Sequence, residues 1–158
     1  MRFLSKLRVF LLMDWKTKGL LLESFCYLGL GRYLKSIPFS KVAPSLGQHM
    51  EETTFEPSVA NKKILSNVSQ AIHIMSQYTF WESQCLVKAI AAMKMLEKRQ
   101  IESTLYLGTA RDNSGELIAH AWLRSGPYYI TGSEGMEKFT VVGKFAKKIG
   151  GKSNGETI

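Results

Sequence analysis

The opening segment of the chain places apolar residues at helical spacing. Apolar side chains recur every three or four positions, which predicts a helix over residues 1–13. A second helical pattern covers about 18–36, with Asp14 as a cap between the two helices. The pattern stops at Ile37, because a residue that precedes proline is pushed out of the helical region.

Two further helices are predicted in the middle of the chain. Residues 59–78 carry apolar side chains with a helical period. Residues 85–99 are rich in Ala, Leu, Met, Lys and Glu, which are good helix formers. Ser83 is a natural N-cap for the second of these helices, immediately upstream of Cys85.

After Gln100 the apolar period changes to two, which is typical of strands. Runs rich in Asn, Ser, Gly and Pro separate the strands and predict turns. The strands are predicted over residues 104–110, 117–124, 128–132 and 139–142. Helices followed by an antiparallel meander indicate an α+β fold.

Residues 43–58 interrupt this order of elements. They are mostly polar and contain Pro44, Gly47 and Pro57, so we expect a connector between two parts of the chain. The last residues are small and polar and are expected to be disordered. The predicted organisation is a basic amphipathic helical region over 1–42, a connector over 43–58, a core over 59–149 and a disordered tail over 150–158.

The composition is that of an ordinary globular protein. Of 158 residues, 45% are apolar and 22% are charged. These values exclude a disordered, collagen-like or multi-span membrane protein. Two cysteines make no disulfide framework, and we expect Cys26 to be a small buried thiol in a reducing cytoplasm.

Positive charge is concentrated at the front of the chain. The formal net charge is +8, from 21 basic and 13 acidic residues. Residues 1–50 hold eight basic and two acidic side chains, a net +6, and the remainder contributes +2. The first helix is therefore basic and amphipathic, and three roles stay open for it: packing on its own domain, lying on a membrane surface, or docking a partner.

Several classes of protein are disfavoured by what the chain lacks. The longest uncharged run in the front region, Ser24–Gly31, is far shorter than the roughly 20 residues that span a bilayer. No cleavage site follows a clean apolar segment, so we expect no signal peptide. The histidines and cysteines lack zinc spacing, and no complete nucleotide-binding motif is present, so we expect no metal and no cofactor. No recognition motif for nucleic acid appears either.

Cys85 and His120 form the one pair of residues that suggests catalysis. A cysteine at a helix N-terminus faces unpaired N–H groups and the positive end of the helix dipole, which favour the nucleophilic thiolate. His120 lies in the middle of a predicted strand, where it is either a satisfied core residue or a general base. Cysteine hydrolases need such a pair, with histidine taking the thiol proton and later protonating the leaving amine.

The surrounding residues make the pattern more specific. Its marks are Cys85-Leu86 opening a helix, the basic end Lys98-Arg99, Ile101 before the strand Leu105–Gly108, His120-Ala121-Trp122 on the next strand, and the closing Phe139–Phe145. Together they resemble the transglutaminase-like cysteine peptidases of lasso-peptide biosynthesis, in the stand-alone form whose precursor-recognition module is a separate protein. The Leu-rich basic front is similar to that family too, so the resemblance covers most of the chain.

The resemblance implies a fold, an activity and partners. The fold would be a papain-like, transglutaminase-like core in which a helix carrying the cysteine packs on an antiparallel sheet carrying the histidine. The activity would be removal of the leader from a ribosomally made precursor peptide in the cytoplasm, with Cys85 as nucleophile and His120 as base and then acid. Its partners would be the precursor, the separate recognition protein and a cyclase that closes the macrolactam. The rival hypothesis is a catalytically silent protein that uses its basic helices to dock partners or an anionic membrane surface.

The sequence departs from the family where an aspartate usually orients the histidine. Gly132 occupies that spacing. Glu134 is a substitute within reach, although a solvated loop acid is an equally good interpretation, and Thr131 or Ser133 could orient the ring through a hydroxyl or the backbone.

Two further residues are candidates for lining the site. Gln84 could donate a hydrogen bond to an oxyanion or be a plain loop amide. Trp122 shares the face of His120 and could shield the site or pack in the core.

Overall fold

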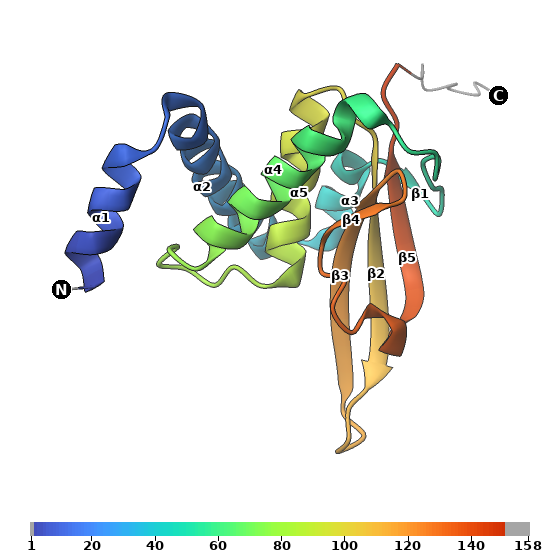
Figure 1. The fold of residues 1–158 in the computed structure, drawn as a ribbon. Coiled ribbons are helices and arrows are strands. Elements are labelled where there is room, and N and C mark those ends of the chain that lie inside the picture. The colour runs from blue at the N-terminus through green and yellow to red at the C-terminus, as the bar shows by residue number, and fades with distance from the viewer. Residues whose placement is uncertain (1, 151–158) are drawn as a thin grey trace.

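A computed structural model of the chain describes residues 2–150, with side chains from Leu4 onward. The predicted disordered tail lies outside these residues, apart from Gly150. The helices are α1 (Arg2–Leu12), α2 (Trp15–Ser36), α3 (Phe39–Leu46), α4 (Val59–Ser76) and α5 (Cys85–Lys98). The strands are β1 (Gln48–His49), β2 (Ser103–Arg111), β3 (Leu117–Ser125), β4 (Tyr128–Thr131) and β5 (Thr140–Lys147). The predicted α+β class is confirmed (Figure 1).

The junction of the first two helices follows the sequence prediction. The Asp14 carboxylate accepts hydrogen bonds from the Thr17 backbone N–H at 3.1 Å and from the Thr17 hydroxyl at 2.6 Å. These bonds hold the pKa of Asp14 below its usual range. Helix α2 begins at Trp15, slightly before the predicted start, and ends at Ser36, two residues ahead of Pro38.

The connector predicted over residues 43–58 is wrong in its first half. Helix α3 occupies residues 39–46 despite Pro44, because it buries Val42 and Leu46 against the core. Strand β1 follows at once and pairs with β5. Tertiary burial therefore overrides the local signals of proline and polar residues.

The sheet is antiparallel throughout, with strand order β1-β5-β2-β3-β4. A simple meander would place β5 beside β4. Instead β5 returns to the other side of the sheet and pairs with β2. The predicted four-strand meander is thus correct for β2, β3 and β4 and wrong for the last strand.

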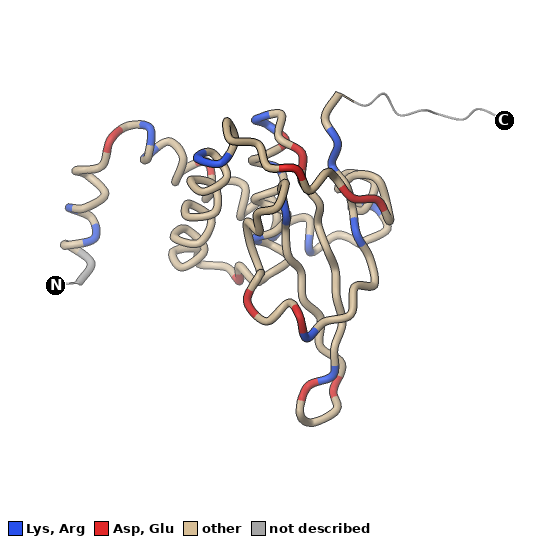
Figure 2. The backbone as a smooth tube through the Cα atoms, turned by 45° about the vertical axis from the view of Figure 1, so that its right-hand side comes forward, with Lys and Arg blue, Asp and Glu red and all other residues tan. Residues whose placement is uncertain are grey.

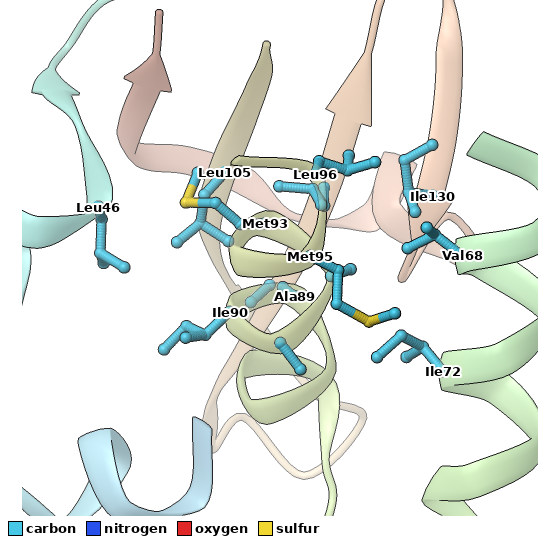
Figure 3. Close-up of a cluster of buried hydrophobic side chains, with 14 of the residues drawn as sticks. Leu46, Val68, Ile72, Ala89, Ile90, Met93, Met95, Leu96, Leu105 and Ile130 are labelled. Carbon is cyan, nitrogen blue, oxygen red and sulfur yellow. The ribbon is translucent and has the colours of Figure 1, made fainter. Parts of the chain in front are cut away.

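Helix α5 lies at the centre of the molecule, between the sheet and helices α2 and α4 (Figure 1). Its side chains Ile90, Met93, Met95 and Leu96 are at most 1% exposed. They meet Leu105 of β2 and residues of α3 and α4 in one core (Figure 3). This packing fixes where α5 begins, and so where Cys85 lies.

Helix α2 shares the same core. Leu28 is fully buried, and a Cβ added at Gly31 would lie 2.8 Å from the Val87 carbonyl oxygen, so the two helix backbones approach closely here. Cys26, which was expected to be buried, is exposed. The reason is spacing, because the buried face of α2 passes through Ser24 and Leu28 and leaves Cys26 on another side.

An ion pair ties α2 to the end of α5. The Arg99 guanidinium donates to both carboxylate oxygens of Glu23, at 2.7 and 2.8 Å. These hydrogen bonds hold the pKa of Glu23 below its ordinary value.

The sheet face away from α5 is organised around a buried arginine. Arg124 is 1% exposed, and its guanidinium donates to the Tyr106 hydroxyl at 2.9 Å. It also donates to the backbone carbonyls of Thr53, Thr54 and Gly126, at 2.7 to 3.0 Å. These hydrogen bonds hold the segment after β1, at Thr53 and Thr54, against β3.

Tyr106 extends this network to a carboxylate. Its hydroxyl donates to Glu52, and burial together with that hydrogen bond raises the pKa of Tyr106 to about 12. The same hydrogen bond holds the pKa of Glu52 below its ordinary value. The tyrosine therefore stays neutral and remains a donor at physiological pH.

None of the helices within residues 2–150 combines the length and the apolar run needed to cross a bilayer.

Candidate active site

Cys85 is the first residue of α5, as predicted. Gln84 is the N-cap, and its side chain makes no capping hydrogen bond. The predicted cap, Ser83, is wrong: its hydroxyl is instead 2.8 Å from that of Thr79 in the preceding loop. Within residues 2–150, no side-chain hydrogen bond caps the first N–H groups of α5, and such groups can bind a developing negative charge.

A cavity of about 750 Å³ opens beside this helix end. Its walls come from α4, from the first turn of α5, from β3, and from β4 with the loop that follows it. Cys85 and His120 both line it, although a hairpin and a helix separate them in the sequence. Cys85 is half-buried, and its thiol makes no hydrogen bond to any residue in the described range. Catalytic hydrogen bonds are often long without substrate, so the shared cavity is the informative observation.

The His120 ring is held by a backbone carbonyl. Its Nε2 atom lies 2.7 Å from the carbonyl oxygen of Gly132. Because a carbonyl can only accept, Nε2 carries the hydrogen, and in the neutral ring Nδ1 is left with a lone pair. The ring also lies against Phe139 and Trp122, with centroids 5.0 and 5.8 Å away. Orientation and tautomer are thus both specified.

Glu134 does not hold the ring in this structure. It is exposed on the loop after β4 and makes no hydrogen bond within the described part of the chain, although it lines the cavity. The carbonyl of Gly132 takes the position for which Glu134 was considered. The backbone does hold the ring, but through Gly132 and not through Thr131 or Ser133, the two residues for which that role was considered.

The backbone at Gly132 explains why no aspartate stands there. Its φ is +73°, in the left-handed region that favours glycine. A Cβ at this position would lie 2.4 Å from the Ala121 carbonyl oxygen and 3.0 Å from the Cβ of Trp122. The loop therefore passes too close to β3 for any side chain, and this closeness brings its carbonyl to the histidine.

The two other residues predicted for the site lie beside the cavity and do not line it. Trp122 is buried and stacks on Tyr106, with ring centroids 5.6 Å apart and planes 8° from parallel. It supports the His120 ring from the side. Gln84 is exposed at the helix start.

Two cavity-lining side chains, Lys88 and His73, were not predicted from the sequence, whereas Thr131 was considered as a residue that could orient His120. Lys88 lies one turn after Cys85 on the same helix face, a spacing that could have identified it. His73 projects from α4 and is exposed. The hydroxyl of Thr131 is buried without a hydrogen-bond partner in the described residues. No group of three or more His, Cys, Asp or Glu within residues 2–150 is placed to hold a metal ion.

Comparison with known proteins identifies a family. A family model described as the transglutaminase-like superfamily matches residues 33–144, which is more than two thirds of the chain and includes Cys85 and His120. No curated protein and no solved structure gives a match. The superfamily commonly includes cysteine peptidases and transglutaminases.

Proposed function

The chain belongs to the transglutaminase-like superfamily, and from this premise we propose that it is a cysteine peptidase that removes the leader from a lasso-peptide precursor. One observation carries the chemistry. Cys85 and His120 line a single cavity, and the Nε2–H of the ring donates to the Gly132 carbonyl, which leaves a lone pair on Nδ1 of the neutral ring. The substrate class rests on the resemblance of the sequence motifs around these residues.

The first half-reaction forms a thioester. His120 Nδ1 accepts the proton of the Cys85 thiol, and the thiolate sulfur attacks the carbonyl carbon of the scissile peptide bond. Backbone N–H groups at the start of α5 stabilise the oxyanion that develops. The C–N bond then breaks, and His120 donates its proton to the leaving amine, which becomes the new N-terminus of the core peptide.

The second half-reaction restores the enzyme. Water attacks the thioester carbonyl while His120 accepts one of its protons. The C–S bond breaks, the leader departs with a new carboxylate, and Cys85 regains its proton. Throughout, Gly132 stabilises the charged ring, because its carbonyl keeps accepting from Nε2 when Nδ1 is also protonated.

We further propose that this reaction takes place in the cytoplasm and precedes ring closure by a separate cyclase. The chemistry supports that order, since cleavage releases the amine from which a macrolactam can form. A separate recognition protein would present the precursor, as in the stand-alone members of the family that the chain resembles.

The second cysteine of the chain supplies a matched control for the test. Precursor, recognition protein and the purified chain are mixed, and leader release is followed by mass spectrometry. We expect Cys85→Ala and His120→Ala to abolish release and Cys26→Ala to leave it unchanged, because Cys26 is exposed on α2 and lies outside the cavity. Release by Cys85→Ala at the rate of the unmodified protein would instead favour a docking role without catalysis.

A further inference from the structure

Several large apolar side chains of helix α1 are exposed to solvent. Leu4, Leu11 and Leu12 are 69%, 63% and 78% exposed, and Trp15 at the start of α2 is 86% exposed. Figure 1 shows α1 at the end of the molecule farthest from the sheet. Large apolar side chains that gather on one exposed surface mark a site of interaction, so this surface of the amphipathic helix indicates a binding function.

A second apolar surface lies behind α1. A groove of about 790 Å³ separates the helix from the body of the protein. Phe10 and Met13 line it from the α1 side, Leu21 and Phe25 from α2, and Met75 from α4. Leu4, Leu11, Leu12 and Trp15 are not among its lining residues, so apolar side chains extend beyond the groove onto the outer surface.

The charge around these surfaces is positive. Residues 1–18 contain five basic side chains and one acid, Asp14, whose carboxylate is engaged by Thr17. Arg8 and Lys16 are exposed and make no ion pair with any residue that the structure describes. The ammonium of Lys18 lies 5.0 Å from the Trp15 ring centroid. Figure 2 shows basic positions along α1 and at the turn into α2.

We propose that α1 and the start of α2 bind the surface of an anionic phospholipid bilayer. A partner helix seated in the groove would leave Leu4, Leu11 and Leu12 exposed. A lipid interface accounts for both apolar surfaces. When α1 lies in the plane of the headgroups, acyl chains can contact the outer leucines and also the groove. Exposed cations beside an interfacial tryptophan select anionic headgroups over neutral ones.

This proposal does not rest on the proposed peptidase activity, and its test needs no substrate. The full chain is mixed with vesicles of phosphatidylglycerol and phosphatidylcholine in equal parts, or of phosphatidylcholine alone, and bound protein is separated by flotation. We expect binding to the anionic vesicles only, a shift of tryptophan emission to shorter wavelength that Trp15→Phe removes, and weaker binding in high salt.

Two sets of variants separate the apolar and electrostatic contributions. Leu11→Glu with Leu12→Glu is expected to weaken binding by about a hundredfold or more, because two leucines leave the interface. Arg8→Gln with Lys16→Gln is expected to weaken binding about 25-fold, roughly fivefold for each cation.

The matched controls lie on α4. Val59 is 89% exposed and Lys63 is exposed without an ion-pair partner in the described residues, so Val59→Glu and Lys63→Gln should bind as the unmodified protein does. Thermal unfolding checks that every variant is folded. Arg8 and Lys16 do not line the groove, so replacing them tests membrane binding even if the leucine variants fail to fold.

Three results would overturn the proposal. The first is failure of the unmodified protein to float with anionic vesicles. The second is equal binding to neutral vesicles. The third is a dimer in light scattering that Leu11→Glu with Leu12→Glu dissociates while vesicle binding stays unchanged, which would assign the surface to a second copy of the chain.

Discussion

Replacing Gly132 with alanine tests whether its carbonyl positions His120. The substitution adds one methyl group where the backbone is left-handed and where that methyl would lie 2.4 Å from the Ala121 oxygen. Real Cβ atoms essentially never approach another heavy atom more closely than 3.0 Å, so the loop must retreat by the difference, about 0.6 Å.

That retreat is large compared with the tolerance of a hydrogen bond. If the Gly132 carbonyl moves away by the same amount, its 2.7 Å contact with His120 Nε2 lengthens to about 3.3 Å, beyond the usual range for N–H···O bonds. The left-handed backbone adds about 1–2 kcal/mol of strain, and the weakened bond costs about 1 kcal/mol more. We therefore expect a loss of about 2–3 kcal/mol in the free energy of unfolding. Misplacing the ring should lower kcat/KM about a hundredfold.

Gly135 supplies a matched control three residues along the same loop. Its φ is +72°, nearly that of Gly132, but a Cβ there meets nothing within 4 Å. Gly135→Ala should therefore cost only the backbone strain of about 1–2 kcal/mol and change kcat/KM by less than about threefold. Urea unfolding and leader-release kinetics of the two variants give the comparison. If both variants had the same stability and the same activity, the Gly132 carbonyl would have no positioning role.

Three further predictions concern the buried arginine, the pH dependence of stability and the thiol. Arg124→Leu leaves several buried acceptors unpaired and should reduce the free energy of unfolding by about 3 kcal/mol or more, whereas a small loss in urea unfolding would show that the network contributes little. The low pKa of Glu23 means that its ion pair stabilises the fold fully above the carboxyl's unfolded pKa, and this contribution is lost as the pH falls through the lower folded pKa. In Glu23→Gln, the urea midpoint should therefore fall less steeply as the pH drops below the usual pKa of a glutamate, and an unchanged pH dependence would contradict the assignment. His120→Ala should slow alkylation of Cys85 by iodoacetamide at neutral pH and leave Cys26 unaffected, as peptide mapping can measure; equal rates at Cys85 with and without the histidine would contradict their coupling.

The helices and strands with regular patterns could be predicted from the sequence. Helices α4 and α5 and strands β2 and β3 have clear periods and strong turn signals at their ends. Helix α3 was missed because Pro44 and its polar neighbours resemble a loop, and only the burial of Val42 and Leu46 makes it a helix. The partner of β5 was missed because pairing between distant strands leaves no local signal in the sequence.

The candidate site shows the same division. That Cys85 and His120 line one cavity could be anticipated from motif spacing and from the resemblance to a family. The group that holds the histidine could not be anticipated. Every residue has a backbone carbonyl, so residue identities do not indicate which carbonyl accepts the hydrogen bond. A search among side chains leads to Glu134, whereas the tight approach of Gly132 to β3 is visible only in three dimensions.

In the proposed reaction, Cys85 carries the acyl group of the leader during cleavage. The most direct test of this step is mass spectrometry of the protein after acid quenching during turnover of the precursor. We expect a leader adduct on the peptide that contains Cys85, absent from Cys85→Ala and present in Cys26→Ala. A leader adduct on any other residue, or leader release by Cys85→Ala, would contradict it.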